Sequence, residues 1–158
     1  MIENSISNLE EICRNELVGK RIKEVYWLDN AGRLAFGVET NSEHEVHLVF
    51  GNIDCDLVSL ADSILLATDR DESNEFRSVA TNLVGQQITA IDIRKESNLT
   101  LWMTFGNHIR LQLDPCQQPE YDLQAPCWQL FCSDGYVIDV GNPFQSWNRI
   151  HKSSPFWI

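Results

Sequence analysis

The stretch Leu17-Val18-Gly19-Lys20-Arg21-Ile22 returns later in the chain as Leu83-Val84-Gly85-Gln86-Gln87-Ile88, and this repeat organises the sequence. After each copy, apolar residues alternate with polar residues through three short segments. A period of two is typical of strands that are buried on one face. We therefore predict two antiparallel meanders of three strands each, at about 21–28, 33–39 and 45–50 and again at about 87–94, 98–104 and 108–113.

A helix is predicted before each copy of the repeat. Ser7-Asn8-Leu9-Glu10 has the spacing of a capping box, in which the serine and the glutamate satisfy free backbone amides at a helix start. Gly19 and Gly85 stand where a residue in the left-handed conformation would end each helix. One apolar face follows at helical spacing in each unit, formed by Leu9, Ile12, Cys13 and Leu17 and by Phe76, Val79, Ala80 and Leu83.

The last part of the chain differs in composition, because all five prolines lie between Pro115 and Pro155. We expect an irregular stretch up to Pro126, since proline cannot donate to a strand ladder. A hairpin then follows around the turn Ser133-Asp134-Gly135. Its apolar positions are Trp128, Leu130, Cys132, Tyr136, Ile138 and Val140, and the first unit has a weaker counterpart in Ile53, Cys55 and Leu57.

The sequence therefore predicts an α+β fold that is mainly antiparallel β, with two repeated helix-plus-three-strand meander units and a C-terminal hairpin. Its 158 residues suit a single domain that covers 1–158. We place the first repeat unit at about 5–62, the second at about 71–141 and a tail at 142–158. A chain of this size buries enough apolar surface to fold without a metal or a disulfide.

Five tryptophans are a further feature of the sequence. Trp27, Trp102 and Trp128 fall within predicted strands, and we expect them in the core. The tail carries Trp147, Phe156 and Trp157 in a polar, proline-containing context. These tail residues either fold back as a plug, which we favour, or offer aromatic anchors to a partner.

Charge is the main functional signal. Twelve Lys and Arg residues against 23 Asp and Glu give a net charge of −11, which repels nucleic acid and favours a basic partner. The segment 39–75 holds ten acids and Arg70 as its only base. Solvated strand edges and an acidic helix start would also explain this segment. As partner-binding residues we predict Asp54, Asp56, Asp69, Asp71, Glu72 and Glu75, because the first two should point away from the core and the others surround the second helix start.

The expected compartment is the cytoplasm. The first residues, Met1 to Glu16, contain four glutamates and no basic leader, and no charge-free stretch is long enough for a membrane span. Five scattered cysteines are typical of reduced thiols and not of a disulfide framework.

Candidate chemistry is sparse. His44 and His47 could share a zinc ion, but residues three apart on a strand point to opposite faces. Cys127 and Cys132 are five apart on one predicted strand, so they also point to opposite faces and could not bind one ion together. Asp54 and Asp56 share one face and could hold a hard cation, although no loop of further oxygen ligands accompanies them. A cysteine nucleophile with a histidine base stays open, because such partners meet in space. We predict no metal, no cofactor and no enzymatic activity.

The paired Leu-Val-Gly-x-x-Ile starts, together with Trp128-Gln129-Leu130-Phe131 and the Asp134-Gly135-Tyr136 hairpin, resemble small β-rich immunity proteins encoded beside contact-dependent growth inhibition and related polymorphic toxins. The resemblance covers roughly residues 8–147 and concerns framework residues. It implies a cytosolic acidic inhibitor that binds the C-terminal domain of a cognate toxin, often a basic nuclease, and blocks its active site. It carries no set of binding residues.

Two alternatives remain at this stage. An acidic secretion chaperone would share the size, charge and α+β class, and would need an exposed apolar groove. A small hydrolase or ligand-binding enzyme would need a pocket with convergent Cys, His or Asp residues.

Overall fold

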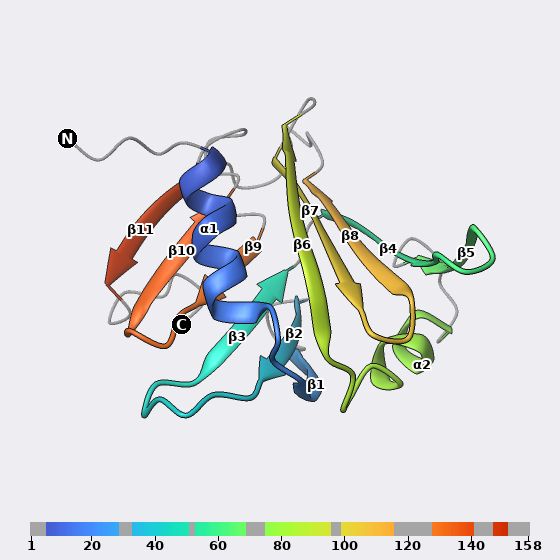
Figure 1. Ribbon diagram of the computed structural model, residues 1–158, viewed down its shortest axis with the longest axis horizontal. Coiled ribbons are helices and arrows are strands. Elements are labelled where there is room, and N and C mark those ends of the chain that lie inside the picture. The colour runs from blue at the N-terminus through green and yellow to red at the C-terminus, as the bar shows by residue number, and fades with distance from the viewer. Residues whose placement is uncertain are drawn as a thin grey trace.

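The computed structural model describes residues 6–28, 33–50, 53–68, 75–95, 99–115, 128–140 and 147–151. This part of the chain contains two helices and eleven strands (Figure 1). In chain order they are α1 (Ile6–Leu17), β1 (Ile22–Leu28), β2 (Arg33–Val38), β3 (Val46–Phe50), β4 (Ile53–Ser59), β5 (Ile64–Thr68), α2 (Glu75–Thr81), β6 (Ile88–Lys95), β7 (Leu99–Phe105), β8 (Ile109–Pro115), β9 (Trp128–Phe131), β10 (Tyr136–Val140) and β11 (Trp147–His151).

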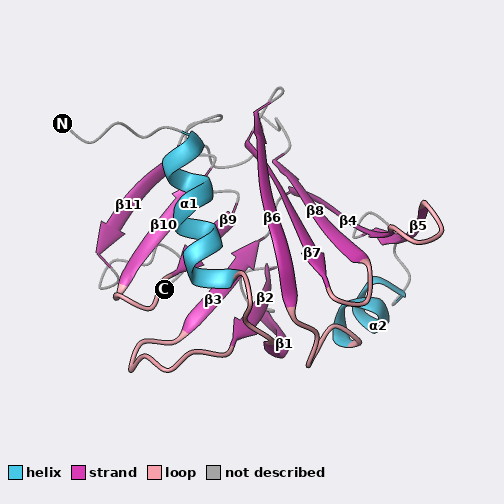
Figure 2. Cartoon of the chain, viewed as in Figure 1, coloured by secondary structure: helices cyan, strands magenta, loops and turns pink. Residues whose placement is uncertain are grey.

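The strands form two antiparallel sheets, and strands dominate the described chain (Figure 2). One sheet has six strands in the order β1-β2-β3-β9-β10-β11, and the other has five in the order β5-β4-β8-β7-β6. The predicted α+β class with mainly antiparallel β structure is confirmed. Strands β1–β3 and β6–β8 lie within one or two residues of the predicted ranges, and the hairpin β9–β10 is present. Strand β11, inside the predicted tail, and strand β5 were not predicted.

Each meander is completed by a hairpin from the other half of the chain. The hairpin β4–β5 follows β3 in sequence, but it pairs with β8, where Cys55 is opposite Leu113. The hairpin β9–β10 follows β8, but it pairs with β3, where Leu48 is opposite Leu130. This exchange joins the two halves through strand ladders.

A second junction lies between the segments that lead from each helix into the next strand. Gly19 donates its amide to the carbonyl of Ile88 at 2.8 Å, and Gly85 donates to the carbonyl of Ile22 at the same distance. Ile22 and Ile88 donate in turn to the carbonyls of Gln86 and Lys20. Both glycines have the predicted left-handed backbone, with φ of 87° and 86°.

The helices pack against the sheets by their predicted faces. Leu9, Cys13 and Leu17 are fully buried, and α1 lies against β6, where the Glu10 carboxylate accepts the Ile93 amide at 2.9 Å. Trp128 is among the largest side chains of the shared core. Burying an apolar side chain of this kind contributes roughly 1.5–3 kcal/mol to stability. No helix within the described residues is long and apolar enough to span a membrane.

The outer faces of the two sheets differ. On the six-stranded sheet, a second buried apolar cluster of Ala35, Val49, Phe131 and Val137 lies opposite the main core. On the five-stranded sheet, the outward residues of β7 are only partly buried, while Leu99, Leu101, Met103 and Phe105 are buried on the inward side.

The tryptophan predictions are partly wrong. Trp102 is not a core residue, because it alternates with the buried residues of β7 and therefore projects from the outer face. Trp128 is buried as predicted, and Trp147 is buried at 3% exposure, as the plug hypothesis expects. The side chain of Trp27 lies outside the described part of the chain, as do Phe156 and Trp157.

Candidate functional site

The predicted acidic residues are only partly described. Asp56 is half-buried on β4, whose alternate residues Cys55 and Leu57 are fully buried, so it projects outward as expected. Asp54 lies two residues earlier on the same strand and Glu75 begins α2, but their side chains are not described. Asp69, Asp71 and Glu72 lie outside the described residues, so the structure does not test whether the six carboxylates come together.

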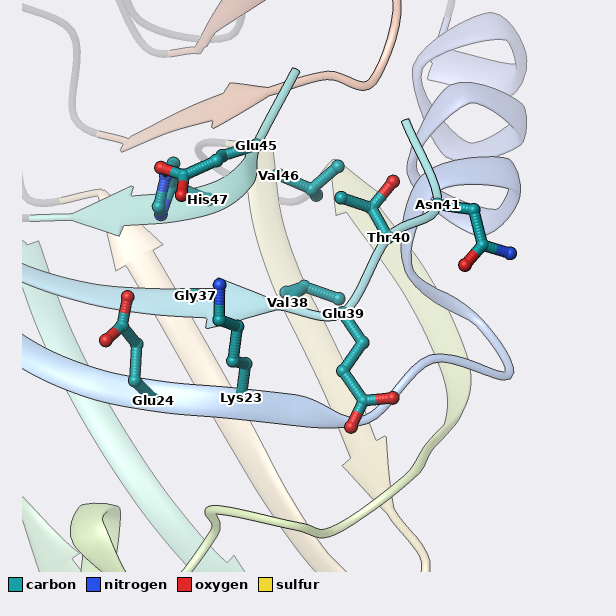
Figure 3. Close-up of a pocket in the computed structure, with 10 residues that line it drawn as sticks. All are labelled: Lys23, Glu24, Gly37, Val38, Glu39, Thr40, Asn41, Glu45, Val46 and His47. Atoms are coloured by element: carbon teal, nitrogen blue, oxygen red, sulfur yellow. Dashed lines mark hydrogen bonds and ion pairs between the residues drawn. The ribbon is translucent and has the colours of Figure 1, made fainter. Parts of the chain in front are cut away.

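A different acidic site is visible on the six-stranded sheet, at the ends of β1, β2 and β3 (Figure 3). A hollow of about 270 Å³ opens there. We call it the acidic hollow, and its described lining residues are Lys23, Glu24, Gly37, Val38, Glu39, Thr40, Asn41, Glu45, Val46 and His47.

Local backbone geometry builds this hollow. The ladder between β1 and β2 shifts register between Ile22 and Glu24, so Lys23 is left over and both Lys23 and Glu24 are exposed. Glu24 pairs with Gly37, and a Cβ atom at Gly37 would lie 2.8 Å from Glu24 Cγ. Any other residue at this position would therefore displace the Glu24 side chain that lies over β2.

Negative charge predominates around the hollow. Glu24, Glu39 and Glu45 are all exposed, and Lys23 is the only lysine or arginine among the described lining residues. In the close-up, Glu24 comes from β1, Glu39 from the residue after β2 and Glu45 from the residue before β3, and the Lys23 side chain extends from β1 toward β2 between Glu24 and Glu39 (Figure 3). The arrangement suits a positively charged side chain that enters from solvent.

A hydrogen-bonded chain of three side chains borders the hollow. The Tyr26 hydroxyl lies 2.9 Å from His47 Nδ1, and His47 Nε2 lies 3.0 Å from a Glu45 oxygen. Burial, with smaller effects of the Glu24 and Glu45 carboxylates, raises the pKa of Tyr26 to about 12. The Glu45 carboxylate can only accept, so it accepts from Nε2–H, and in the neutral ring Nδ1 then accepts from the Tyr26 hydroxyl.

The structure places the two histidines differently. His47 lies on β3, both of its ring nitrogens are engaged and its side chain is only 16% exposed. His44 lies in the bend before β3. The sequence feature that could have indicated the contact between Glu45 and His47 is their spacing of two residues, because residues i and i+2 of an extended segment lie on the same face.

A possible metal-ligand group was not visible in the sequence. Single ligand atoms of Glu16, Cys132 and Asp134 lie within 4.8 Å of one another. The Glu16 oxygens accept the Ser133 amide at 3.1 Å and the Ser133 hydroxyl at 3.0 Å, while Asp134 accepts the Tyr136 amide and pairs with Arg149. Glu16 therefore holds the β9–β10 turn against the end of α1, whereas Asp134 joins the turn to β10 and β11.

The chain matches no protein-family model, no curated protein and no solved structure. Function is therefore inferred from the fold and from the chemistry of the protein surface. They define an acidic, antiparallel β protein with a negatively charged hollow at one end of its larger sheet.

Proposed function

We propose that this protein is a non-catalytic inhibitor of the immunity type, which binds a cognate toxin C-terminal domain and covers its active site. The toxin domain is basic, and a nuclease fits this charge best. The observation that supports the proposal most directly is the acidic hollow, because it places three exposed carboxylates around a space large enough for the end of an Arg or Lys side chain.

Such an inhibitor would compete with phosphate for the toxin's basic residues. A guanidinium or ammonium group that holds phosphate can equally pair with Glu24, Glu39 or Glu45. Pairs at the rim of such an interface contribute about 1 kcal/mol or less, whereas truncating one member of a fully desolvated pair costs about 2–5 kcal/mol. The net charge of −11 would add long-range attraction.

Within the described residues, the group beside the hollow that a hydrolase could use is the hydrogen-bonded set of Tyr26, His47 and Glu45. With its pKa raised to about 12, the Tyr26 phenol is a hydrogen-bond donor and a poor nucleophile at neutral pH. The contacts of Tyr26, His47 and Glu45 support a structural role, in which they hold β1 and β3 together. An inhibitor therefore explains the hollow better than a hydrolase does.

We also propose that the fold arose from two tandem helix-plus-meander units. The reciprocal amide bonds of Gly19 and Gly85 support this, as do two matched side-chain bonds, from Arg21 Nη1 to the Gly85 carbonyl at 2.8 Å and from Gln87 Nε2 to the Gly19 carbonyl at 3.1 Å. Both first strands also carry a bulge, after Ile22 and after Ile88. In this view each unit donates its trailing hairpin to the other.

The function is tested with the product of the adjacent upstream reading frame. Its C-terminal domain should be toxic when expressed alone, and co-expression of this protein should restore growth and yield a one-to-one complex. The variant E24Q/E39Q should bind at least about tenfold more weakly, because it removes two carboxylates of the hollow.

The matched control is E11Q/D62N, which removes the same charge at exposed positions outside the hollow. Equal losses in both double variants would mean that only net charge matters and that the hollow is not the contact. A toxin domain that kills equally well with and without this protein would refute the function.

A further inference from the structure

Three side chains of types that bind metal ions meet where the β9–β10 turn lies against the end of α1. Single ligand atoms of Glu16, Cys132 and Asp134 lie within 4.8 Å of one another. Glu16 is in the last turn of α1, Cys132 directly follows β9, and Asp134 lies in the turn that leads into β10. Zinc holds thiolate sulfur at about 2.3 Å and carboxylate oxygen at about 2.0–2.2 Å, so the ligands of one ion are at most about 4.5 Å apart. The three atoms are therefore close to the spacing that one ion needs, and we call these three residues the turn cluster.

Hydrogen bonds already orient both carboxylates of the turn cluster. Glu16 accepts the Ser133 amide at 3.1 Å and the Ser133 hydroxyl at 3.0 Å. Asp134 Oδ1 accepts the Tyr136 amide at 3.0 Å. An ionised carboxylate has about four acceptor sites, so these contacts leave sites for an ion. Because hydrogen bonds of this kind hold carboxylate ligands in position around bound metals, the turn cluster has its ligands ordered in advance.

An imidazole lies against the same turn. A Cβ atom at Gly135 would be 3.2 Å from His44 Nε2, so the histidine ring packs on the residue that follows Asp134. Ser42 reinforces this contact, because its hydroxyl donates to the Ser133 carbonyl at 2.6 Å. The His44 side chain is 43% exposed, so its torsion angles can change without disturbing the core. Imidazole nitrogen is a preferred ligand of zinc, and this one borders the turn cluster.

Local electrostatics favour a cation at the turn cluster. Glu16 lies in the last turn of α1, where the helix dipole is negative and a carboxylate is disfavoured. Burial raises the pKa of the neighbouring Cys13 thiol above its usual value, and the charges of Cys132 and Glu16 raise it further. Negative charge is therefore concentrated at this end of α1, and a divalent cation would offset it.

We propose that the turn cluster is a zinc site, in which Glu16, Cys132 and Asp134 bind one ion and His44 turns to complete a tetrahedral set. Binding releases the thiol proton of Cys132 to solvent, because the thiolate is the ligand. The ion would tie α1, the β2–β3 connection and the β9–β10 turn together. This inference does not depend on the proposed function.

The proposal revises the prediction, made from the sequence, that the chain binds no metal. That prediction compared pairs of residues close together in the chain, such as His44 with His47. The turn cluster joins residues from α1 and from the β9–β10 hairpin, which only the folded chain brings together.

Arg149 is the group that competes with the ion. Its guanidinium pairs with Asp134 and also lies 4.5 Å from the ring centre of Tyr136. It is about half exposed, so it can leave Asp134 when an ion arrives. We expect R149Q to bind zinc about threefold or more tightly than wild type, because it removes a positive charge beside a ligand. An ion bound elsewhere would not respond to this change.

The experiment titrates the full chain with Co²⁺ and then with Zn²⁺ after treatment with a chelator. Wild type should bind one ion per chain, and bound Co²⁺ should show the charge-transfer absorption of a thiolate ligand. C132A should lose this absorption. E16Q, D134N and H44Q should each weaken zinc binding by about tenfold or more. The matched control is C55A, because Cys55 is also buried but lies on β4 of the other sheet, and it should bind as wild type does.

Three results would overturn the inference. In the first, wild type binds neither ion with a dissociation constant below about 0.1 mM. In the second, C132A, E16Q and D134N bind zinc as tightly as wild type, which would mean an adventitious ion only. In the third, R149Q leaves the affinity unchanged, which would remove Asp134 from the site. E16Q and D134N change residues that are not buried, so they keep the inference testable if C132A fails to fold.

Discussion

Gly19 and Gly85 illustrate how a single residue determines local structure in this protein. Gly19 lies two residues after α1 and Gly85 lies four residues after α2, and each has a positive φ and donates its amide to the opposite half of the chain. A Cβ atom at either glycine would have no heavy atom within 4 Å, so a substitution there would act through backbone conformation alone.

We predict that Gly19→Ala and Gly85→Ala each lower the free energy of unfolding by about 1–2 kcal/mol, because L-residues are strained in the left-handed region. Urea denaturation measures the change. Gly106→Ala is the control, since Gly106 lacks a positive φ and its added Cβ would meet neighbours only at 3.8 Å or more. If all three variants lose the same stability, the strain argument is wrong.

Tyr26 gives a pH prediction at the same scale. Its folded-state pKa of about 12 lies above the usual tyrosine value of about 10, so the unfolded chain releases this proton first as pH rises. The stabilisation is fully present below about pH 10 and is lost as pH rises from about 10 to 12.

Phenolate absorbance of the folded protein should therefore show a late titration step that belongs to Tyr26. The variant Y26F should lack this late step, and its free energy of unfolding should fall less steeply between about pH 10 and 12. Identical titration curves for Y26F and wild type would show that Tyr26 is not the shifted group.

At the scale of elements, the exchanged hairpins determine how the chain folds. Strand β8 lies between β4 and β7, and strand β3 lies between β2 and β9, so each sheet needs strands from both halves. A meander that lacks its exchanged hairpin leaves an apolar edge strand unpaired, which is unfavourable.

We predict that residues 1–70 and 71–158, expressed as separate fragments, are each unfolded or aggregated alone and regain β structure when mixed. The division falls between β5 and α2, outside both. Circular dichroism and amide hydrogen exchange before and after mixing provide the measurement. A fragment that shows a cooperative unfolding transition by itself would contradict this prediction.

At the scale of the whole molecule, net charge affects binding more than it affects the fold. With 12 basic and 23 acidic residues, the field of the protein extends well beyond its contact surfaces at low salt. The Debye length falls from about 30 Å at 0.01 M to about 8 Å at 0.15 M ionic strength, so added salt screens the long-range attraction.

We therefore predict that the association rate constant with the toxin domain falls by about tenfold or more over this range of salt, while the dissociation rate changes little. Stopped-flow fluorescence of the tryptophans can follow both rates. The prediction would be contradicted by a dissociation rate that rises with salt while the association rate stays constant. In that case the charges would stabilise the bound complex and would not speed the encounter of the two proteins.

Local sequence patterns predicted most of the elements correctly. Alternation identified β1–β3, β6–β8 and β9–β10, and helical spacing with a terminal glycine identified α1 and α2, because these signals depend only on residues close together in the chain. The same patterns placed Asp56 on an outward position. They did not find the hollow, because it needs a bulge at Lys23 and a glycine on the neighbouring strand.

Sequence alone determined the fold class, the left-handed backbone of Gly19 and Gly85 and the overall charge of this protein, whereas the predicted helix ends were only partly right, since α1 begins before Ser7 and α2 ends at Thr81. Tertiary structure alone decided that each hairpin joins the meander of the other half, because strand pairing between distant segments depends on the fit of whole sheets. It also decided that Trp102 projects outward between Arg94 and Arg110, since alternation separates the two faces of a strand but does not say which face another layer covers.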